Sequence, residues 1–171
     1  MVWQVLVIAI IAYLIGSINP SIILSKLLKK EDIRTQGSGN AGTTNTLRVL
    51  GKGPAIIVLI IDVLKAVIAV LLGSWIGTLG NYSTEEFALL HDYALMASGI
   101  GAILGHNFPI YYGFKGGKGV ATSLGVLLTL NWQIGLICLV FALILIALTK
   151  MVSVGSISAG ILFPVLVAFI K

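Results

Sequence analysis

The chain has 171 residues, of which 58% are apolar and only 10% are charged, with a net charge of +5. A soluble domain carries about 25% charged residues, so this chain has too few polar side chains to cover a water-exposed surface. With a mean hydropathy of +1.08, this composition excludes a soluble enzyme, a disordered tail and a secreted disulfide scaffold.

Five apolar stretches are long enough, at about 1.5 Å rise per residue, to cross a hydrocarbon core roughly 30 Å thick. They are residues 2–25, 54–78, 93–112, 119–149 and 151–170. Stretch 119–149 would be too long for one crossing without strong tilt, and we expect a turn at Asn131-Trp132-Gln133 to split it and leave a short first half. The sequence thus predicts an all-α integral membrane protein, with residues 1–171 forming a single polytopic helical bundle of about six spans.

The charges in the connecting loops predict the orientation. Loops 26–53 and 113–118 are basic, Lys150 closes the fifth span, and loop 79–92 holds Glu85, Glu86 and Asp92 with no Lys or Arg. With the split accepted, all basic loops fall on one side, which the positive-inside rule makes cytoplasmic. We therefore expect an external N-terminus, with Trp3, Trp75 and Trp132 at the outer interface. This topology also explains the net positive charge without a nucleic acid partner.

Loop 34–53 is rich in glycine and in side-chain donors. Its glycines match G-x-G-x-x-G literally, but no strand precedes them and no βαβ unit fits, so a dinucleotide fold is excluded. Glycines let backbone N–H groups approach an anion, and the fork of Arg48 fits phosphate oxygens. The alternative is an ordinary solvated loop. The candidate anion-binding residues of this loop are Ser38, Gly39, Asn40, Gly42, Thr44, Asn45 and Arg48.

Residues 105–119 form a second candidate anion site. Two lysines flank a glycine pair, and an apolar helix starts at once, so its N-terminal dipole favours negative charge. The alternative is that the lysines only mark the cytoplasmic side and the glycines only make turns. Two such loops on one face predict two phosphate-bearing ligands, or one ligand with two phosphates. The candidates here are Lys115, Gly116, Gly117, Lys118 and Gly119.

Several other residues carry a structural and a functional interpretation. His106 precedes the second loop and is a candidate for a proton shuttle or for a structural hydrogen bond. Asp62 and Lys65 lie three residues apart inside a span, where we expect an ion pair that faces the bundle. Ser153 and Ser156 begin the last span and either donate to a phosphate or ease helix packing. The single Cys138 has no partner for a disulfide or a thiolate metal site.

These motifs resemble those of the bacterial membrane acyltransferases that acylate glycerol 3-phosphate from acyl phosphate. The resemblance rests on the run from Ser38 to Arg48, on Gly105-His106 with Phe108-Pro109, and on the run from Phe114 to Thr122. It extends along nearly the whole chain, in the same order and with the same span pattern.

The resemblance implies a seven-helix bundle in the bacterial inner membrane with a cytoplasmic active site. It implies transfer of an acyl group from acyl phosphate to the 1-hydroxyl of glycerol 3-phosphate, giving lysophosphatidic acid, without a cofactor or a metal. Ser38 and Arg48 match the essential serine and arginine of the first family motif. Lys115–Gly119 match the glycerol-phosphate-binding loop, in which we assign Lys118 to catalysis. The implied partners are the two substrates, membrane lipid and the peripheral enzyme that makes acyl phosphate.

The chain departs from the family pattern near its end. The family carries a third motif with an essential histidine and asparagine on and after a seventh span, whereas no histidine follows His106 here. We therefore expect residues 1–171 to form six of seven spans and to have little activity alone, with Lys171 outside. Two other functions stay open on the sequence: a transporter or channel for a phosphate-bearing solute, and a lipid-binding subunit without chemistry.

Overall fold

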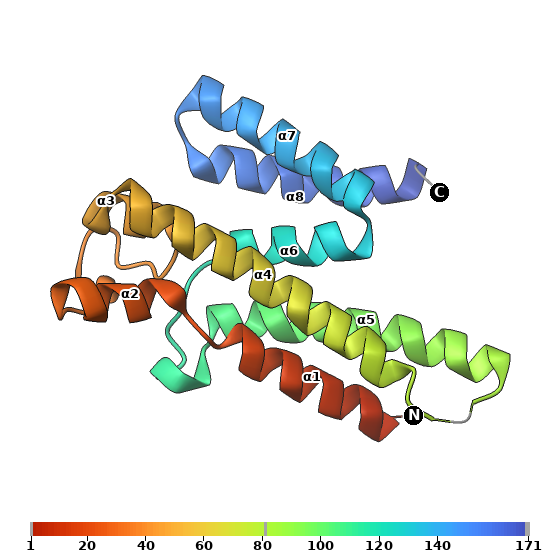
Figure 1. Ribbon diagram of the computed structural model, residues 1–171. Helices are drawn as coiled ribbons and strands as arrows, with labels where there is room; N and C mark the ends of the chain where they lie inside the picture. Colours follow the sequence, from red (N-terminus) through yellow and green to blue (C-terminus); the bar gives the residue numbers. More distant parts are fainter. Residues whose placement is uncertain (1, 81, 170–171) are drawn as a thin grey trace. The chain divides into compact units, whose positions relative to one another are not determined.

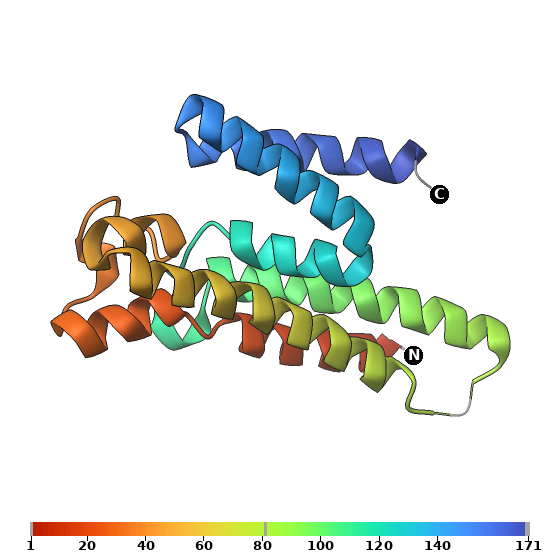
Figure 2. The ribbon, with the colours of Figure 1, turned by 45° about the horizontal axis from the view of Figure 1, so that its top comes forward.

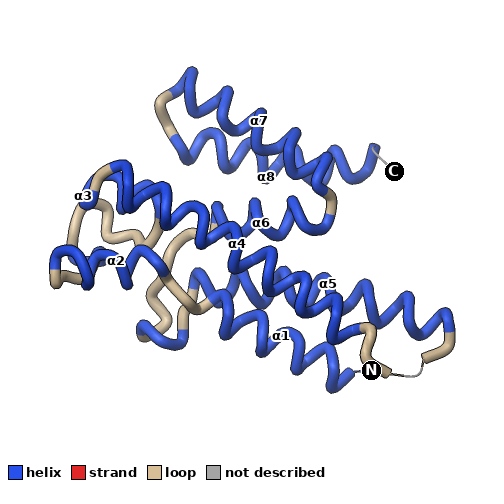
Figure 3. Tube along the Cα trace, in the orientation of Figure 1, coloured by secondary structure: helices blue, strands red, loops and turns tan. Residues whose placement is uncertain are grey.

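The computed structural model describes residues 2–80 and 82–169. Within these residues every regular element is a helix and no strand occurs (Figure 3), which confirms the all-α prediction. The α-helices are α1 (Val2–Gly16), α2 (Pro20–Lys29), α3 (Thr43–Leu50), α4 (Lys52–Gly77), α5 (Thr84–Asn107), α6 (Val120–Leu130), α7 (Trp132–Thr149) and α8 (Val152–Phe169), with short 3-10 helices η1 (Ile33–Thr35) and η2 (Ile110–Tyr112).

The chain divides into two compact units, Met1–Val126 and Leu127–Lys171, with the boundary inside α6. In the first unit α1, α4 and α5 run side by side, and the start of α1 lies near the turn between α4 and α5 (Figures 1 and 2). Small residues let these helices approach closely, as is common in membranes. A Cβ added at Gly105 of α5 would lie 2.2 Å from the carbonyl oxygen of Tyr13 on α1, so only glycine permits this packing.

Five stretches in the described residues are long and apolar enough to cross a membrane: Val2–Lys29, Lys52–Gly77, Thr84–Tyr112, Trp132–Thr149 and Val152–Phe169. Helix α6 is apolar but shorter. The predicted split of 119–149 is confirmed, because Asn131 separates α6 from α7 and its side chain accepts a hydrogen bond from the backbone N–H of Ile134 at 3.1 Å. An asparagine in this N-cap position stabilises the first turn of a new helix.

Three predicted boundaries were wrong, and each has a local cause. Stretch 2–25 is two helices, because Asn19 caps α2 through the N–H of Ile22 and Pro20 occupies its first position. Loop 79–92 is largely helical, because Ser83 and Glu86 form a capping box that starts α5. Loop 34–53 contains the whole of α3. The expectation for Lys171 lies outside the described residues.

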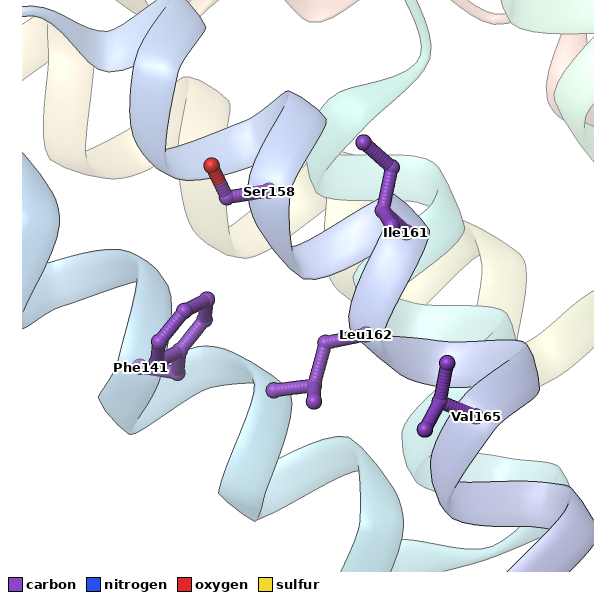
Figure 4. A pocket seen from close by; sticks show the side chains of 5 residues that line it. All are labelled: Phe141, Ser158, Ile161, Leu162 and Val165. Carbon is purple, nitrogen blue, oxygen red and sulfur yellow. The ribbon is translucent and has the colours of Figure 1, made fainter.

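The second unit contains α7 and α8, which form an antiparallel pair. A Cβ at Gly155 of α8 would lie 2.6 Å from the carbonyl oxygen of Ala142 on α7, so these helices also pack closely. A shallow cavity of about 310 Å³ lies between them (Figure 4), lined by Phe141, Ser158, Ile161, Leu162 and Val165. Its lining is apolar except for one hydroxyl, which suits lipid or a neighbouring helix better than a charged ligand.

Candidate active site

The two glycine-rich segments lie at one end of the first unit. We call residues 36–42, between η1 and α3, the first glycine loop, and residues 113–119, between η2 and α6, the second glycine loop. Figures 1 and 2 show α2, α3 and η2 gathered at the end of the unit opposite the start of α1. Eight Lys and Arg residues lie on and beside the two loops, and such a concentration of positive charge attracts phosphate-bearing ligands. The basic residues on and beside the loops are Lys26, Lys29, Lys30, Arg34, Arg48, Lys52, Lys115 and Lys118.

Asn45, in the first turn of α3, holds the first glycine loop from inside. Its buried amide nitrogen donates to the carbonyl oxygens of Ile33 at 3.1 Å and Gln36 at 3.0 Å. Its amide oxygen accepts from the backbone N–H of Ser38 at 2.8 Å. Both amide hydrogens are therefore used within the protein, whereas the sequence interpretation placed Asn45 among the residues that bind substrate. The residue positions Ser38 instead.

Ser38 and Arg48 are exposed and unengaged. Neither the Ser38 hydroxyl nor the Arg48 guanidinium makes a hydrogen bond or ion pair to any residue that the structure describes. Gly39 is exposed with a left-handed φ of +71°, Asn40 and Thr44 are half-buried, and Gly42 is buried just before α3. Ser38 of the first glycine loop and Arg48 of α3 are therefore exposed to solvent, whereas Asn45 of α3 is held inside.

Arg34, in η1 just before the first glycine loop, is bonded to η2 and to the second glycine loop. Its guanidinium makes a two-point contact with Asp32, at 2.9 Å and 2.8 Å, and donates through Nη1 to the carbonyl oxygens of Tyr112 at 2.6 Å and Lys115 at 2.9 Å. The side-chain hydrogen bonds from Arg34 lower the pKa of Asp32 below its ordinary value, and the same bonds raise the pKa of Arg34. Both groups stay charged at neutral pH, so the link persists. The sequence interpretation assigned no role to Arg34.

The second glycine loop is folded back on the end of α5. The N–H of Gly116 donates to the carbonyl oxygen of Asn107 and the N–H of Gly117 donates to that of His106, both at 3.1 Å. These two N–H groups are therefore paired within the protein. The unpaired donors of this segment are the exposed ammonium groups of Lys115 and Lys118 and the start of α6.

Gly117 is where the two loops meet. A Cβ built there would lie 2.1 Å from Nε2 of His106 and 2.5 Å from the carbonyl oxygen of Ala41, which belongs to the first glycine loop. That same carbonyl accepts a hydrogen bond from the side chain of Asn19, in the α1–α2 break, at 3.3 Å. The glycine is therefore required by close packing of three segments that are far apart in the sequence.

Two buried polar atoms near the loops have no hydrogen-bond partner among the described residues. They are the hydroxyl oxygen of Thr43, the first residue of α3, and the amide oxygen of Asn107, the last residue of α5. The Asn107 oxygen lies beside buried Gly119, at 2.7 Å from a Cβ built there. Buried polar atoms are nearly always paired, so these two atoms are available to accept or donate a hydrogen bond beside the loops.

His106 belongs to a buried cluster with Asp62 and Lys65 of α4. The Lys65 ammonium lies 2.7 Å from a carboxylate oxygen of Asp62, which confirms the predicted intramembrane ion pair. Nδ1 of His106 lies 3.0 Å from the ammonium and 3.2 Å from the same carboxylate oxygen. All three side chains are less than 5% exposed. His106 thus makes the structural hydrogen bond that the sequence left as one of two interpretations.

The two remaining sequence candidates belong to the second unit. Ser153 and Ser156 are on α8 in the second unit, where the Ser156 hydroxyl donates to the carbonyl oxygen of Ser153 at 3.2 Å. That bond is typical of a serine that satisfies itself within a helix. Within residues 2–80 and 82–169, no three His, Cys, Asp or Glu side chains come together in a way that could hold a metal ion.

Sequence reasoning missed Arg34, Asp32 and Asn19, all of which position the loops. The Asp32-x-Arg34 spacing is a short-range signal for a local ion pair, and Asn19-Pro20 is a signal for a helix start. Neither signal says which distant carbonyl the side chain will reach. Those contacts exist only once α5 brings the second loop beside the first.

The chain is similar to known membrane proteins along almost its whole length. The family model for glycerol-3-phosphate acyltransferase matches residues 6–171. The glycerol-3-phosphate acyltransferase of Thermoanaerobacter pseudethanolicus is 48% identical over 92% of this chain and 73% of its own length. That of Shouchella clausii is 47% identical over 96% of this chain and 76% of its own length.

The fold is similar to that of a solved enzyme in two states. The crystal structure of PlsY, an integral membrane glycerol 3-phosphate acyltransferase, in its glycerol 3-phosphate form matches with a TM-score of 0.78 and 36% identity, covering 92% of this chain and 72% of that one. The lysophosphatidic acid form matches with a TM-score of 0.75 and 34% identity, covering 93% and 73%.

Proposed function

Since the chain belongs to the glycerol-3-phosphate acyltransferase family, we propose that it moves an acyl group from acyl phosphate to the 1-hydroxyl of glycerol 3-phosphate where its two glycine loops meet. The chain is a multi-pass membrane acyltransferase that forms lysophosphatidic acid. The use of acyl phosphate, and not another donor, is part of the proposal. The two other functions that the sequence left open, a transporter or channel for a phosphate-bearing solute and a lipid-binding subunit without chemistry, do not fit this family membership.

One observation carries the proposal. Ala41 of the first glycine loop and Gly117 of the second lie 76 residues apart in the sequence, yet they touch, and Arg34 of the adjoining η1 binds the carbonyl oxygens of Tyr112 and Lys115. Lys115 and Lys118 lie on either side of Gly117 in the chain, Arg48 lies on α3 after the first glycine loop, and all three side chains are exposed. Two phosphate-bearing substrates that react with each other need adjacent cationic sites, and this arrangement supplies them.

The reaction balances without a protein nucleophile. The 1-hydroxyl oxygen of glycerol 3-phosphate attacks the acyl carbon, an ester C–O bond forms, and the bond from that carbon to the phosphate oxygen breaks. Inorganic phosphate leaves and carries away the hydroxyl proton, with the donor's own phosphate as the base. Arg48 and Lys118 neutralise the negative charge on that leaving phosphate, and Ser38 aligns the reacting hydroxyl. The Lys115–Gly119 segment holds glycerol 3-phosphate.

We assign the site to the cytoplasmic face of a bacterial cell membrane, with the N-terminus outside. The support is the difference in charge between the two ends of the first unit. Lys and Arg are concentrated beside both glycine loops, whereas segment 79–92 at the other end contains Asp and Glu but no Lys or Arg. Glycerol 3-phosphate is a charged metabolite that does not cross lipid, so a cytoplasmic site is where it is available. A peripheral enzyme that makes acyl phosphate is the partner that this placement favours.

Cysteine labelling tests the orientation. Cysteines placed at Ser38, in the first glycine loop, and at Ser83, before α5, should react with a membrane-impermeant thiol reagent from opposite sides of intact membranes. The native Cys138 is 3% exposed and gives little background. Labelling of both positions from the same side would contradict the assignment.

An assay tests the reaction itself. Residues 1–171, with and without a C-terminal extension that carries the family's seventh span and third motif, are purified in detergent or lipid and given palmitoyl phosphate and glycerol 3-phosphate. Lysophosphatidic acid and free phosphate are measured together, and turnover is expected chiefly from the extended protein, in which the kinetic variants are also compared. We expect the two products in equal amounts, and no product when palmitoyl-CoA replaces palmitoyl phosphate. Equal rates with palmitoyl-CoA would show that the donor is assigned wrongly.

The charge-preserving change Arg48→Lys should lower kcat at least about tenfold. An ammonium cannot make the two parallel hydrogen bonds of a guanidinium, and losing one charge-assisted hydrogen bond costs about 1.5–3 kcal/mol. The matched control is Arg34→Lys, which should instead raise the KM for glycerol 3-phosphate, because Arg34 holds the second loop and touches no substrate. If kcat of the Arg48 variant matched that of the parent protein, Arg48 would not contact the leaving phosphate.

A further inference from the structure

A buried ionic cluster lies directly behind the junction of the two glycine loops. Asp62 and Lys65 lie one turn apart on α4, and His106 lies in the last turn of α5. Their side chains are 1%, 4% and 3% exposed. Charged groups buried to this extent are costly unless each finds a partner, so the pattern of partners is tightly constrained.

The Lys65 ammonium determines which ring nitrogen of His106 carries the proton. An ammonium has three N–H donors and no acceptor, and three atoms lie within its reach: a carboxylate oxygen of Asp62 at 2.7 Å, the carbonyl oxygen of Ile18 at 2.7 Å, and Nδ1 of His106 at 3.0 Å. Each of the three Lys65 N–H groups has its own acceptor only if Nδ1 of His106 is unprotonated and accepts a hydrogen bond. In the neutral ring the proton then sits on Nε2.

The two other protonation states of His106 do not fit this geometry. A proton on Nδ1 would donate to the Asp62 carboxylate oxygen at 3.2 Å, but it would also face a Lys65 N–H across the shorter distance of 3.0 Å and leave that ammonium donor without an acceptor. A doubly protonated ring would add a second positive charge to a cluster with a single carboxylate, and an uncompensated charge in a buried place is disfavoured. With a neutral ring the cluster has no net charge.

Nε2 of His106 lies at the meeting point of the loops. It is the atom nearest to a Cβ built on Gly117, at 2.1 Å, and the Ala41 carbonyl oxygen of the first glycine loop is next, at 2.5 Å. No hydrogen-bond partner of Nε2 lies in the part of the chain that the structure describes. The site therefore holds a fixed N–H donor whose acceptor is to be supplied by something else.

We propose that the buried Asp62–Lys65 pair holds His106 as the neutral, Nε2-protonated tautomer, and that this N–H donates to a phosphate oxygen of the ligand bound at the second glycine loop. Asp62 and Lys65 are positioning residues that act through His106. The identity of the ligand as glycerol 3-phosphate rests on the proposed function, whereas the tautomer does not. A neutral donor binds phosphate without adding charge to the membrane interior.

Nitrogen NMR tests the tautomer directly, because the chain has only two histidines. With ¹⁵N-labelled histidine, the His106 ring should show a protonated Nε2 and an unprotonated Nδ1 at neutral pH. The Nε2 atom of His91 lies 3.1 Å from the Ser74 hydroxyl. The signals of His91 are identified by their absence from the spectrum of His91→Gln. A proton on Nδ1, or on both nitrogens, would overturn the proposal without any variant of the cluster.

Titration with phosphate ligands tests the contact between the ligand and Nε2–H separately from the tautomer of the ring. Inorganic phosphate and glycerol 3-phosphate are each added to the labelled full chain, and we expect both to shift the Nε2–H signal of His106 but not the signals of His91. This arm needs no turnover, so it remains informative even if the proposed reaction fails. An unchanged His106 signal at saturating glycerol 3-phosphate would refute the donor role.

Two variants of His106 separate the N–H donor from the shape of the ring. His106→Gln places an amide N–H near the position of Nε2, whereas His106→Phe keeps the ring and removes the donor; both lose Nδ1. We expect the KM for glycerol 3-phosphate to be at least about tenfold higher in the Phe variant than in the Gln variant, with similar KM values for acyl phosphate. Equal KM values for glycerol 3-phosphate would contradict the proposal. A difference confined to acyl phosphate would assign the donor to the wrong phosphate.

Lys65→Met tests the positioning role. Without the ammonium, Asp62 becomes the acceptor closest to His106, at 3.2 Å from Nδ1, and the ring should gain a proton on Nδ1. The same ¹⁵N spectrum reads this change. A variant that folds, with an unchanged tautomer, would show that Lys65 does not set it; if the variant does not fold, the parent spectrum decides the proposal.

Discussion

Replacing Gly117 with alanine should raise the KM for glycerol 3-phosphate by about a hundredfold, a scale typical of displacing a binding group by an ångström. The added Cβ would lie 2.1 Å from Nε2 of His106 and 2.5 Å from the Ala41 carbonyl oxygen. The histidine cannot retreat, because Lys65 and Asp62 hold its other face. The second glycine loop must therefore move away from the first.

Steady-state kinetics with each substrate varied in turn measures this effect. Gly53→Ala is the matched control, since a Cβ at that position of α4 meets nothing within 4 Å, and its constants should stay those of the parent protein. If Gly117→Ala left the KM for glycerol 3-phosphate unchanged while weakening acyl phosphate binding, the assignment of the two loops to the two substrates would be wrong.

The sequence predicted the helices where a single local signal decides the outcome. Stretch 119–149 is uncharged and too long for one crossing, and Asn131 interrupts it. This signal correctly indicated two helices. The same kind of signal at Asn19-Pro20 was overlooked because the surrounding run is apolar on both sides of the break. The capping residues Ser83 and Glu86 were also readable, but the acidic residues around them suggested a loop.

The candidate site was predictable in composition and not in geometry. Glycines, lysines and Arg48 singled out two segments of the sequence, and the structure brings these segments together. However, the sequence does not show that Asn45 is turned inward or that the N–H groups of Gly116 and Gly117 are already paired. These facts depend on carbonyl groups contributed by η1 and α5, and such contacts between distant segments leave no short-range pattern.

Asn45→Asp should reduce kcat at least about a thousandfold, since a buried charge without a partner costs several kcal/mol. The two side chains have nearly the same shape, but a carboxylate cannot donate to the carbonyl oxygens of Ile33 and Gln36, which lie 3.1 Å and 3.0 Å from the amide nitrogen. Three negative oxygens would face one another in a buried place. The first glycine loop must then open, and Ser38 loses the bond that orients it.

The measurement is kcat at saturating substrates, with the thermal unfolding midpoint as a check that the bundle is intact. Asn131→Asp is the control, because the N-cap of α7 only accepts a hydrogen bond, which a carboxylate does equally well. The loop is held by α3 and η1, whereas the bundle is held by α1, α4 and α5, so a large loss of kcat should accompany a small change in the midpoint. A variant with near-parental kcat would show that the inward turn of Asn45 does not position Ser38 for the reaction.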